Sequence, residues 1–251
     1  MERGRRDILM ARRIGRGQRD ILTARRMERG QRDILTVRRI ERGQRDILTR
    51  KRMTRGRSAS AREGETMDEK KIERGVKEIL AGIGEDLVNA EVLANTPRRV
   101  AAMYAEFFAA AAENPANALG VVYQEAYEEM IVMKDIPFFS ICEHHLLPFI
   151  GKADLVYVPK DGRIVGASKL ARVVDIAAGR PQLQERLTSQ IADALVEKLD
   201  PHGVLVRIEA SHLCMTLRGV RKPGATMVTS AIRGRFYKDE ASRAEAFALI
   251  A

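Results

Sequence analysis

Apolar residues recur every three to four positions in two stretches that follow residue 67, and this spacing predicts two helices. The first stretch, residues 68–83, carries Gly82 near its end as a stop signal. The second stretch, residues 96–112, begins with Thr96-Pro97, which predicts an N-cap followed by a proline in the first helical position. We therefore expect a helical segment ahead of the first strand.

From residue 130 onward the pattern changes, because short runs of β-branched and other apolar residues are typical of strands. The predicted elements in this part are strands at 131–136 and 153–158, helices at 168–178 and from Pro181 onward, and strands at 204–210 and 227–232. This order predicts an α+β fold, with an antiparallel sheet and helices on one face.

Residues 1–66 are a basic tandem repeat with a period of 13 residues, in copies that begin at Glu2, Gly15, Glu28 and Glu41. Thirteen residues are too few for a folded repeat unit, and successive Ile-Leu pairs would not align on one face of a helix. We therefore expect a disordered arm, or translated repetitive sequence upstream of a native start at Met67. The folded domain is then 67–251, with a helical part at 67–128 followed by a part that contains the predicted strands at 129–238.

The net charge of +10 belongs to this arm, where 21 Lys and Arg face 9 Asp and Glu, whereas the rest of the chain has 23 and 25. A nucleic-acid or anionic-lipid partner is the alternative interpretation of the arm. Its regularly placed acidic residues and its lack of aromatic residues count against that alternative. No apolar run approaches the ~20 residues of a membrane span, and no secretory signal is visible. We expect a soluble, cytoplasmic protein with free thiols.

Both cysteines and three of the four histidines lie in two short segments, Cys142-Glu-His-His145 and His212-Leu-Cys214. Thiolate and imidazole are the ligands that Zn²⁺ prefers. The C-x-x-H spacing places Cys142 and His145 on one side of a turn, and His212 and Cys214 are expected on one face at the end of a strand. Cys142, Cys214 and one histidine would leave the fourth tetrahedral position to water, as in catalytic zinc sites.

The spacing leaves the choice between His144 and His145 as the ligand open. The other histidine, together with His212, would carry protons. The alternative interpretation is that the two cysteines are buried, free thiols that pack as small apolar residues. The presence of two such segments in one chain favours the metal site. His202 has no neighbouring candidate in the sequence and is predicted to be exposed.

The chain resembles the GTP cyclohydrolase I family in three stretches. They read SICEHHLLPFIGKADLVYVPKDGRIVGASKLARVV, GRPQLQERLTSQIADAL and EASHLCMTLRGVRKPGATMVTSAIRGRF. The likeness extends from about Ile72 to about Phe236. It implies a tunnelling fold and a hydrolase that converts GTP and water to 7,8-dihydroneopterin triphosphate and formate, the entry to folate or pterin synthesis. It also implies a toroidal homodecamer with active sites between subunits.

The resemblance assigns roles to individual residues. Cys142, His145 and Cys214 are implied to bind zinc, and His144 and His212 are implied to be catalytic. The implied GTP-binding residues are Gln184 and Glu185 for the guanine base, and Ser168, Lys169, Arg172, Arg218 and Arg99 for the triphosphate, the last from a neighbouring subunit. A carboxylate that accepts from the guanine N1–H and amino group would favour G over A, and guanidinium groups suit phosphate oxygens.

Two rival functions remain at this point. One is another tunnelling-fold enzyme of pterin or deazapurine metabolism, which would lack the three-ligand zinc set. The other is a nucleic-acid-binding protein that acts through the basic arm, which would show salt-dependent binding that is lost with residues 1–66.

Overall fold

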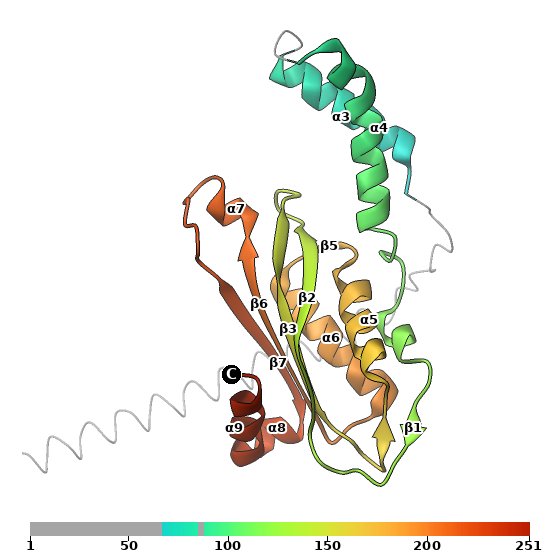
Figure 1. Ribbon diagram of the computed structural model, residues 1–251, viewed down its shortest axis with the longest axis vertical. Coiled ribbons are helices and arrows are strands. Elements are labelled where there is room, and N and C mark those ends of the chain that lie inside the picture. Colours follow the sequence, from blue (N-terminus) through green and yellow to red (C-terminus); the bar gives the residue numbers. More distant parts are fainter. Residues whose placement is uncertain (1–66, 85–87) are drawn as a thin grey trace, which may run out of the picture. The chain divides into compact units, whose positions relative to one another are not determined.

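The computed structural model describes residues 67–84 and 88–251 (Figure 1). The predictions made for residues 1–66, a disordered arm or a non-native start, lie outside this part of the chain. Residues 67–251 belong to one compact unit. None of the helices in the described part combines the length and the hydrophobicity that a membrane span requires.

Two helices open the unit, α3 (Glu69–Ile83) and α4 (Ala90–Phe107), and they pack against each other. Both begin at a side-chain cap: Asp68 accepts from the Lys71 N–H and Asn89 accepts from the Val92 N–H. The predicted start of the second helix at Thr96-Pro97 is wrong. Because Asn89 already caps the helix, α4 begins about two turns earlier and Pro97 lies inside it, buried.

The centre of the unit is a five-stranded sheet with the order β5-β2-β3-β6-β7. Its strands are β2 (Ile131–Cys142), β3 (Pro148–Val158), β5 (Pro181–Gln182), β6 (Gly203–His212) and β7 (Met227–Gly234). The pairs β2–β3, β3–β6 and β6–β7 are antiparallel, whereas β5 pairs with β2 in parallel. The sheet is therefore mixed, which differs from the purely antiparallel sheet predicted. A separate pair joins β1 (Tyr123–Gln124) to β4 (Arg163–Ile164), after the 3₁₀ helix η2 (Pro115–Leu119).

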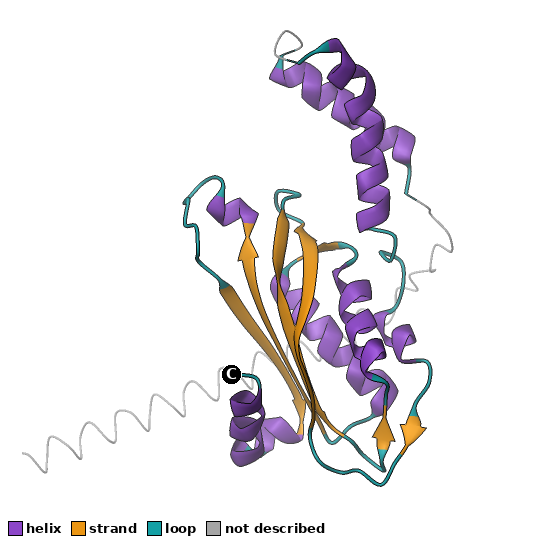
Figure 2. Ribbon diagram, in the orientation of Figure 1, coloured by secondary structure: helices purple, strands orange, loops and turns teal. Residues whose placement is uncertain are grey.

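One face of the sheet is covered by α5 (Ala167–Ala178) and α6 (Gln184–Leu199), as Figure 2 shows. Side chains alternate between the two faces along each strand. Leu155 and Tyr157 of β3 accordingly pack in the main core with both helices. Pro181 is predicted to open the second of these helices, but it lies in β5, and α6 starts at Gln184.

Two further helices lie against the opposite face, so the prediction of helices on one face is incomplete. They are α8 (Arg235–Lys238) and α9 (Glu240–Leu249), near the C-terminus in Figure 1. Val156 and Val158 of β3 pack there with Phe236 and Ala246 in a second, smaller core. The sequence pattern missed these helices because each buries only one or two side chains. The α+β class is confirmed.

We predict that the attachment of α9 weakens at acidic pH. Asp239 caps α9, and its carboxylate accepts from the Ser242 hydroxyl, the Ser242 N–H and Arg235, which lowers its pKa to about 2. Because the unfolded group titrates near 3.8, the stabilisation is fully present above about pH 4 and is lost as the pH falls through about 2.

The variant Asp239→Asn tests this, because it keeps a neutral acceptor. The melting temperature of the wild type should exceed that of Asp239→Asn at neutral pH, and the difference should vanish near pH 2. A difference that is independent of pH would contradict this assignment.

Candidate metal centre and nucleotide site

Cys142 is the last residue of β2, and its side chain is buried. A tight turn follows, in which the Leu146 N–H donates to the Cys142 carbonyl (2.9 Å) and the Cys142 N–H donates to the Leu147 carbonyl (2.9 Å). Leu146 takes a left-handed conformation at φ 53° so that the chain can enter β3. The turn thus fixes Cys142 at the edge where β2 and β3 meet, with His144 and His145 in the turn itself.

His212 and Cys214 reach the same place from a different direction. His212 is the last residue of β6, and Cys214 lies in the single-turn helix α7 (Leu213–Thr216) that follows. The prediction that both residues belong to the end of a strand is therefore wrong for Cys214. The change from strand to helix after His212 brings the thiol back towards the imidazole.

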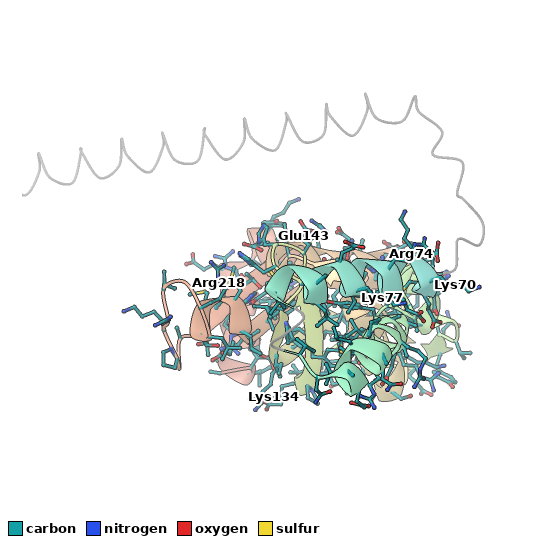
Figure 3. All side chains as sticks on the ribbon, turned by 90° about the horizontal axis from the view of Figure 1, so that it is seen from above. Lys70, Arg74, Lys77, Lys134, Glu143 and Arg218 are labelled. Carbon is teal, nitrogen blue, oxygen red and sulfur yellow. The ribbon has the colours of Figure 1, made fainter. Side chains whose placement is uncertain are left out.

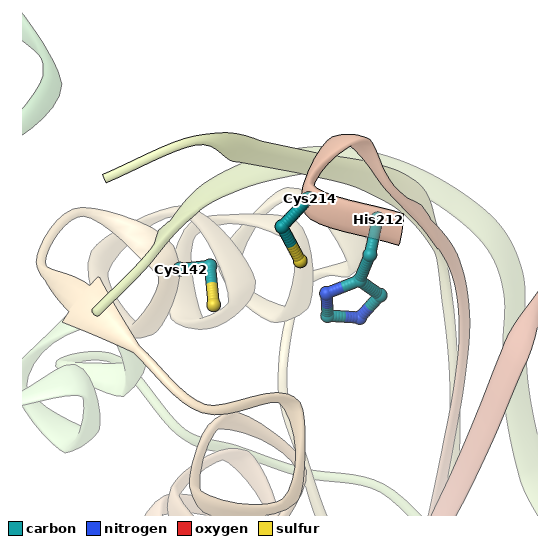
Figure 4. Close-up of side chains that lie close together, drawn as sticks. All are labelled: Cys142, His212 and Cys214. Carbon is teal, nitrogen blue, oxygen red and sulfur yellow. The ribbon is translucent and has the colours of Figure 1, made fainter. Parts of the chain in front are cut away.

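The side chains of Cys142, His212 and Cys214 form a cluster in which the potential ligand atoms all lie within 4.8 Å of one another. Figure 4 shows both sulphurs and one ring nitrogen of His212 facing a common space. Burial, and then the neighbouring Cys142 thiol, raise the pKa of the Cys214 thiol. Two neighbouring thiols beside an imidazole are a donor set that a divalent cation would stabilise as thiolates. The residues present fit a zinc ion.

The two histidines of the turn have other neighbours. The Nε2 atom of His145 lies 2.7 Å from a guanidinium nitrogen of Arg218. Arg218, which Figure 3 labels, follows α7 in the chain. The Nδ1 atom of His144 lies 3.8 Å from the Cys142 sulphur. The structure therefore brings His212 among the sulphurs and holds His145 against Arg218. The assignment of His145 as the third ligand and of His144 and His212 as catalytic residues stays a prediction.

His212 is held on two sides. Its ring stacks on Phe149, with the ring centroids 4.6 Å apart and the planes inclined by 4°. Its Nε2 atom lies 2.8 Å from the side-chain oxygen of Gln184. Burial lowers the pKa of His212, and the nearby charge of Glu185 offsets part of this lowering. His212 is thus favoured in its neutral form, which can accept a proton or bind a metal.

The start of α6 adjoins the metal cluster because β5, which precedes it, pairs with the end of β2. Gln182 of β5 is in register with Cys142, and Gln184 and Glu185 follow at once. Arg186 donates two hydrogen bonds to Glu143 of the turn (2.8 and 2.9 Å), which lowers the pKa of Glu143. This paired contact ties the turn to α6. Glu185, at the exposed start of the helix, lies where a ligand beside the cluster could reach it.

The five residues predicted on the triphosphate side do not gather in one chain. Arg218 lies at the metal end through its contact with His145. Ser168, Lys169 and Arg172 lie in the first two turns of α5, whose other end leads into β5 beside Cys142. At 1.5 Å per residue along the axis, Ser168 and Lys169 lie about 14–15 Å from the end of α5, and Arg172 about 9 Å from it. Arg99 donates to Glu91 within α4 (2.9 Å).

Two features of the site escaped sequence reasoning. The stacking of Phe149 on His212 arises because these residues are partners in the register of β3 and β6, and register is a property of strand pairing. The burial of Gln184 against His212 is the second feature. The stretch GRPQLQERLTSQIADAL predicted that Gln184 belongs to the site. Only the fold shows which way its side chain faces.

The fold and the site together define an α+β protein with a cluster of two thiols and an imidazole that could hold a metal ion. The cluster lies at the ends of the sheet strands, beside the first turn of a helix. Comparison with known proteins identifies the family. The GTP cyclohydrolase I family matches residues 72–251. The chain therefore belongs to the GTP cyclohydrolase I family of enzymes, which confirms the resemblance seen in the sequence and extends it beyond Phe236.

Individual relatives agree with this placement. GTP cyclohydrolase 1 of Desulforamulus reducens is 60% identical over 183 residues, which cover 73% of this chain and 97% of that protein. The proteins of the same name from Halalkalibacterium halodurans and Bacillus subtilis are 56% and 55% identical, over 73% and 71% of this chain and 97% and 94% of their own lengths.

Proposed function

We propose that this protein is a zinc-dependent hydrolase of the cytoplasm that converts GTP and water to 7,8-dihydroneopterin triphosphate and formate, the first step of folate and pterin synthesis. Its relatives carry the name GTP cyclohydrolase 1. The observation that carries the proposal is the cluster of Cys142, His212 and Cys214 beside the start of α6. A metal-ligating set lies there next to a carboxylate that could recognise guanine.

Cys142 and Cys214 would hold the ion, with His145 as the third ligand. A bound zinc ion would lower the pKa of water to about 7, which gives a nucleophile at neutral pH. Burial lowers the pKa of the half-buried His212, and the residue would accept and return a proton during opening of the imidazole ring and loss of formate. His144, one residue from the ligand, is the second proton carrier in this scheme.

Recognition of GTP would be divided between two ends of the protein. The Glu185 carboxylate would accept from the guanine N1–H and amino group, which adenine does not offer in that arrangement. Arg218 lies at the same end and would contact a phosphate. Ser168 and Lys169 lie near the other end of α5, and Arg172 lies about halfway along it. A complete site would therefore take these residues, together with Arg99, from a second copy, as in a homodecamer.

The domain boundaries follow the same scheme. Residues 67–128 would be the helical part that contributes Arg99, and residues 129–238 would be the catalytic part with the tunnelling fold. Every proposed zinc-binding, catalytic and base-binding residue lies in the second part.

The test is incubation of the purified full chain with GTP. We expect release of one formate per GTP, together with a product that becomes a fluorescent pterin on oxidation, and about one zinc ion per chain by elemental analysis. His212→Ala should lower the rate by about 10²–10⁴-fold, the usual contribution of a general acid–base group. His202→Ala is the matched control and should keep the wild-type rate. Absence of formate, or full activity in metal-free protein, would refute the proposal.

A further inference from the structure

The side chain of Gln184 is almost fully buried, with 1% of its surface exposed, although it lies in the first turn of α6. Its Nε2 atom donates to the carbonyl of Ile208 (3.2 Å), the carbonyl of Met227 (2.9 Å) and the hydroxyl of Thr229 (3.1 Å). Its Oε1 atom lies 2.8 Å from Nε2 of His212. Both ends of the amide thus have partners inside the protein.

These partners allow only one orientation of the amide. A flipped amide would put its oxygen against two carbonyl oxygens, none of which can donate. The hydroxyls nearby agree. The Thr188 hydroxyl donates to the main-chain carbonyl of Gln184 (2.6 Å) and lies 2.7 Å from the Thr229 hydroxyl. Since each hydroxyl has one proton, Thr229 must donate to Thr188 and is left to accept from Gln184. The oxygen of the Gln184 amide therefore faces His212.

An oxygen acceptor in this place determines which ring nitrogen of His212 carries the proton. Nε2 must be protonated to donate to Gln184, so Nδ1 keeps its lone pair in the neutral ring. Figure 4 shows the second ring nitrogen of His212 directed towards the sulphurs of Cys142 and Cys214. Stacking on Phe149 fixes the plane of the ring, and the hydrogen bond fixes its rotation within that plane.

We propose that Gln184 is a positioning residue, which fixes the tautomer and orientation of His212, and that Glu185 alone of the two residues reads the guanine base. Neighbouring residues on a helix point about 100° apart, so the buried direction of Gln184 leaves Glu185 facing outward. For Gln184 to contact a base, its amide would have to leave four hydrogen-bond partners. The expected changes in kcat and KM rest on the proposed function. The tautomer of His212 and its hydrogen bond to Gln184 do not.

Gln184→Met, which has a similar shape and no acceptor, tests the proposal by two independent measurements. In the metal-free protein, ¹⁵N chemical shifts of the ring nitrogens report the tautomer. With four histidines in the chain, the signal of His212 is identified by its loss in His212→Ala. We expect a single Nε2–H form in the wild type and a mixture of tautomers in Gln184→Met. In the zinc-loaded enzyme we expect kcat to fall by about 10–100-fold, as for other residues that orient a reactive side chain, with KM for GTP unchanged.

Glu185→Gln provides the contrast, since it should raise KM for GTP and leave the tautomer of His212 unchanged. If Gln184→Met fails to fold, Gln184→Leu, which also lacks an acceptor, takes its place, with the same expected mixture of tautomers and the same contradicting results. The proposal is overturned if Gln184→Met keeps the wild-type tautomer, or if it raises KM while kcat is kept. If the wild type releases no formate, the proposed function fails, and the ¹⁵N measurement still decides the role of Gln184.

Discussion

Replacement of Cys214 by serine should remove the bound zinc and lower formate release from GTP by at least about a thousandfold. Serine offers a poor ligand in place of a thiolate, and only Cys142 would remain as a sulphur ligand. Metal-ion catalysis is worth several kcal/mol of transition-state stabilisation, and about 4 kcal/mol corresponds to three powers of ten in rate. The measurements are elemental analysis of zinc and single-turnover formate release.

Met215→Ser is the matched control, because Met215 is the next residue in α7 and lies outside the metal cluster. It should keep zinc and the wild-type rate within about twofold, the range of substitutions away from a site. A Cys214→Ser protein that retains one zinc ion and full activity would place the metal elsewhere.

The same measurement decides which histidine is a ligand. The proposed set of Cys142, His145 and Cys214 predicts that His145→Ala loses zinc, whereas His212→Ala keeps zinc and loses rate. The opposite result would make the cluster of Cys142, His212 and Cys214 the ligand set itself. In that case His145, held by Arg218, would become the candidate for the proton carrier.

Gly151→Ala should lower the free energy of unfolding by about 3 kcal/mol, the upper range for added atoms in a packed interior. Gly151 lies in β3 beside β6, and a Cβ atom there would lie 2.1 Å from the Glu209 carbonyl oxygen and 2.7 Å from the Ala210 Cα. Both are backbone atoms in a central strand, so the clash can be relieved only by moving the strands apart. Phe149, which stacks on His212, is two residues away, and kcat should fall as well.

Urea denaturation of the two proteins measures the difference. Gly75→Ala is the control, because a Cβ atom at Gly75, inside α3, would meet nothing within 4 Å. It should raise the free energy of unfolding by about 0.5–1 kcal/mol, since alanine favours a helix over glycine. Equal stability of Gly151→Ala and the wild type would show that β3 and β6 can separate without cost.

The sequence was informative where local chemistry decides the outcome. Thiolate and imidazole are uncommon enough that two short segments containing them predicted a shared site, and Cys142 and Cys214 do meet. Periodic apolar residues likewise predicted α3, α5 and the four longer strands of the sheet, because burial on one face leaves a visible repeat. Strand β5 was not predicted.

The remainder depends on contacts between distant segments. The start of α4 was misplaced because Thr96-Pro97 has the local features of a cap, while the actual cap at Asn89 is an equally ordinary residue. Helix α9 has a weak apolar face and was missed. The direction of the Gln184 side chain depends on Ile208, Met227 and Thr229, which only the pairing of β6 and β7 brings to it.

The separation of the start of α5 from Cys142 has a consequence for mixtures of variants. If each complete site takes its phosphate-binding residues from a neighbour, every chain serves two sites, one through the start of α5 and one through Cys142. A copy with a faulty Lys169 then impairs only the site to which it contributes α5, and a copy with a faulty Cys214 impairs only its own metal site. Two variants that are inactive alone should therefore regain part of the activity when they assemble together.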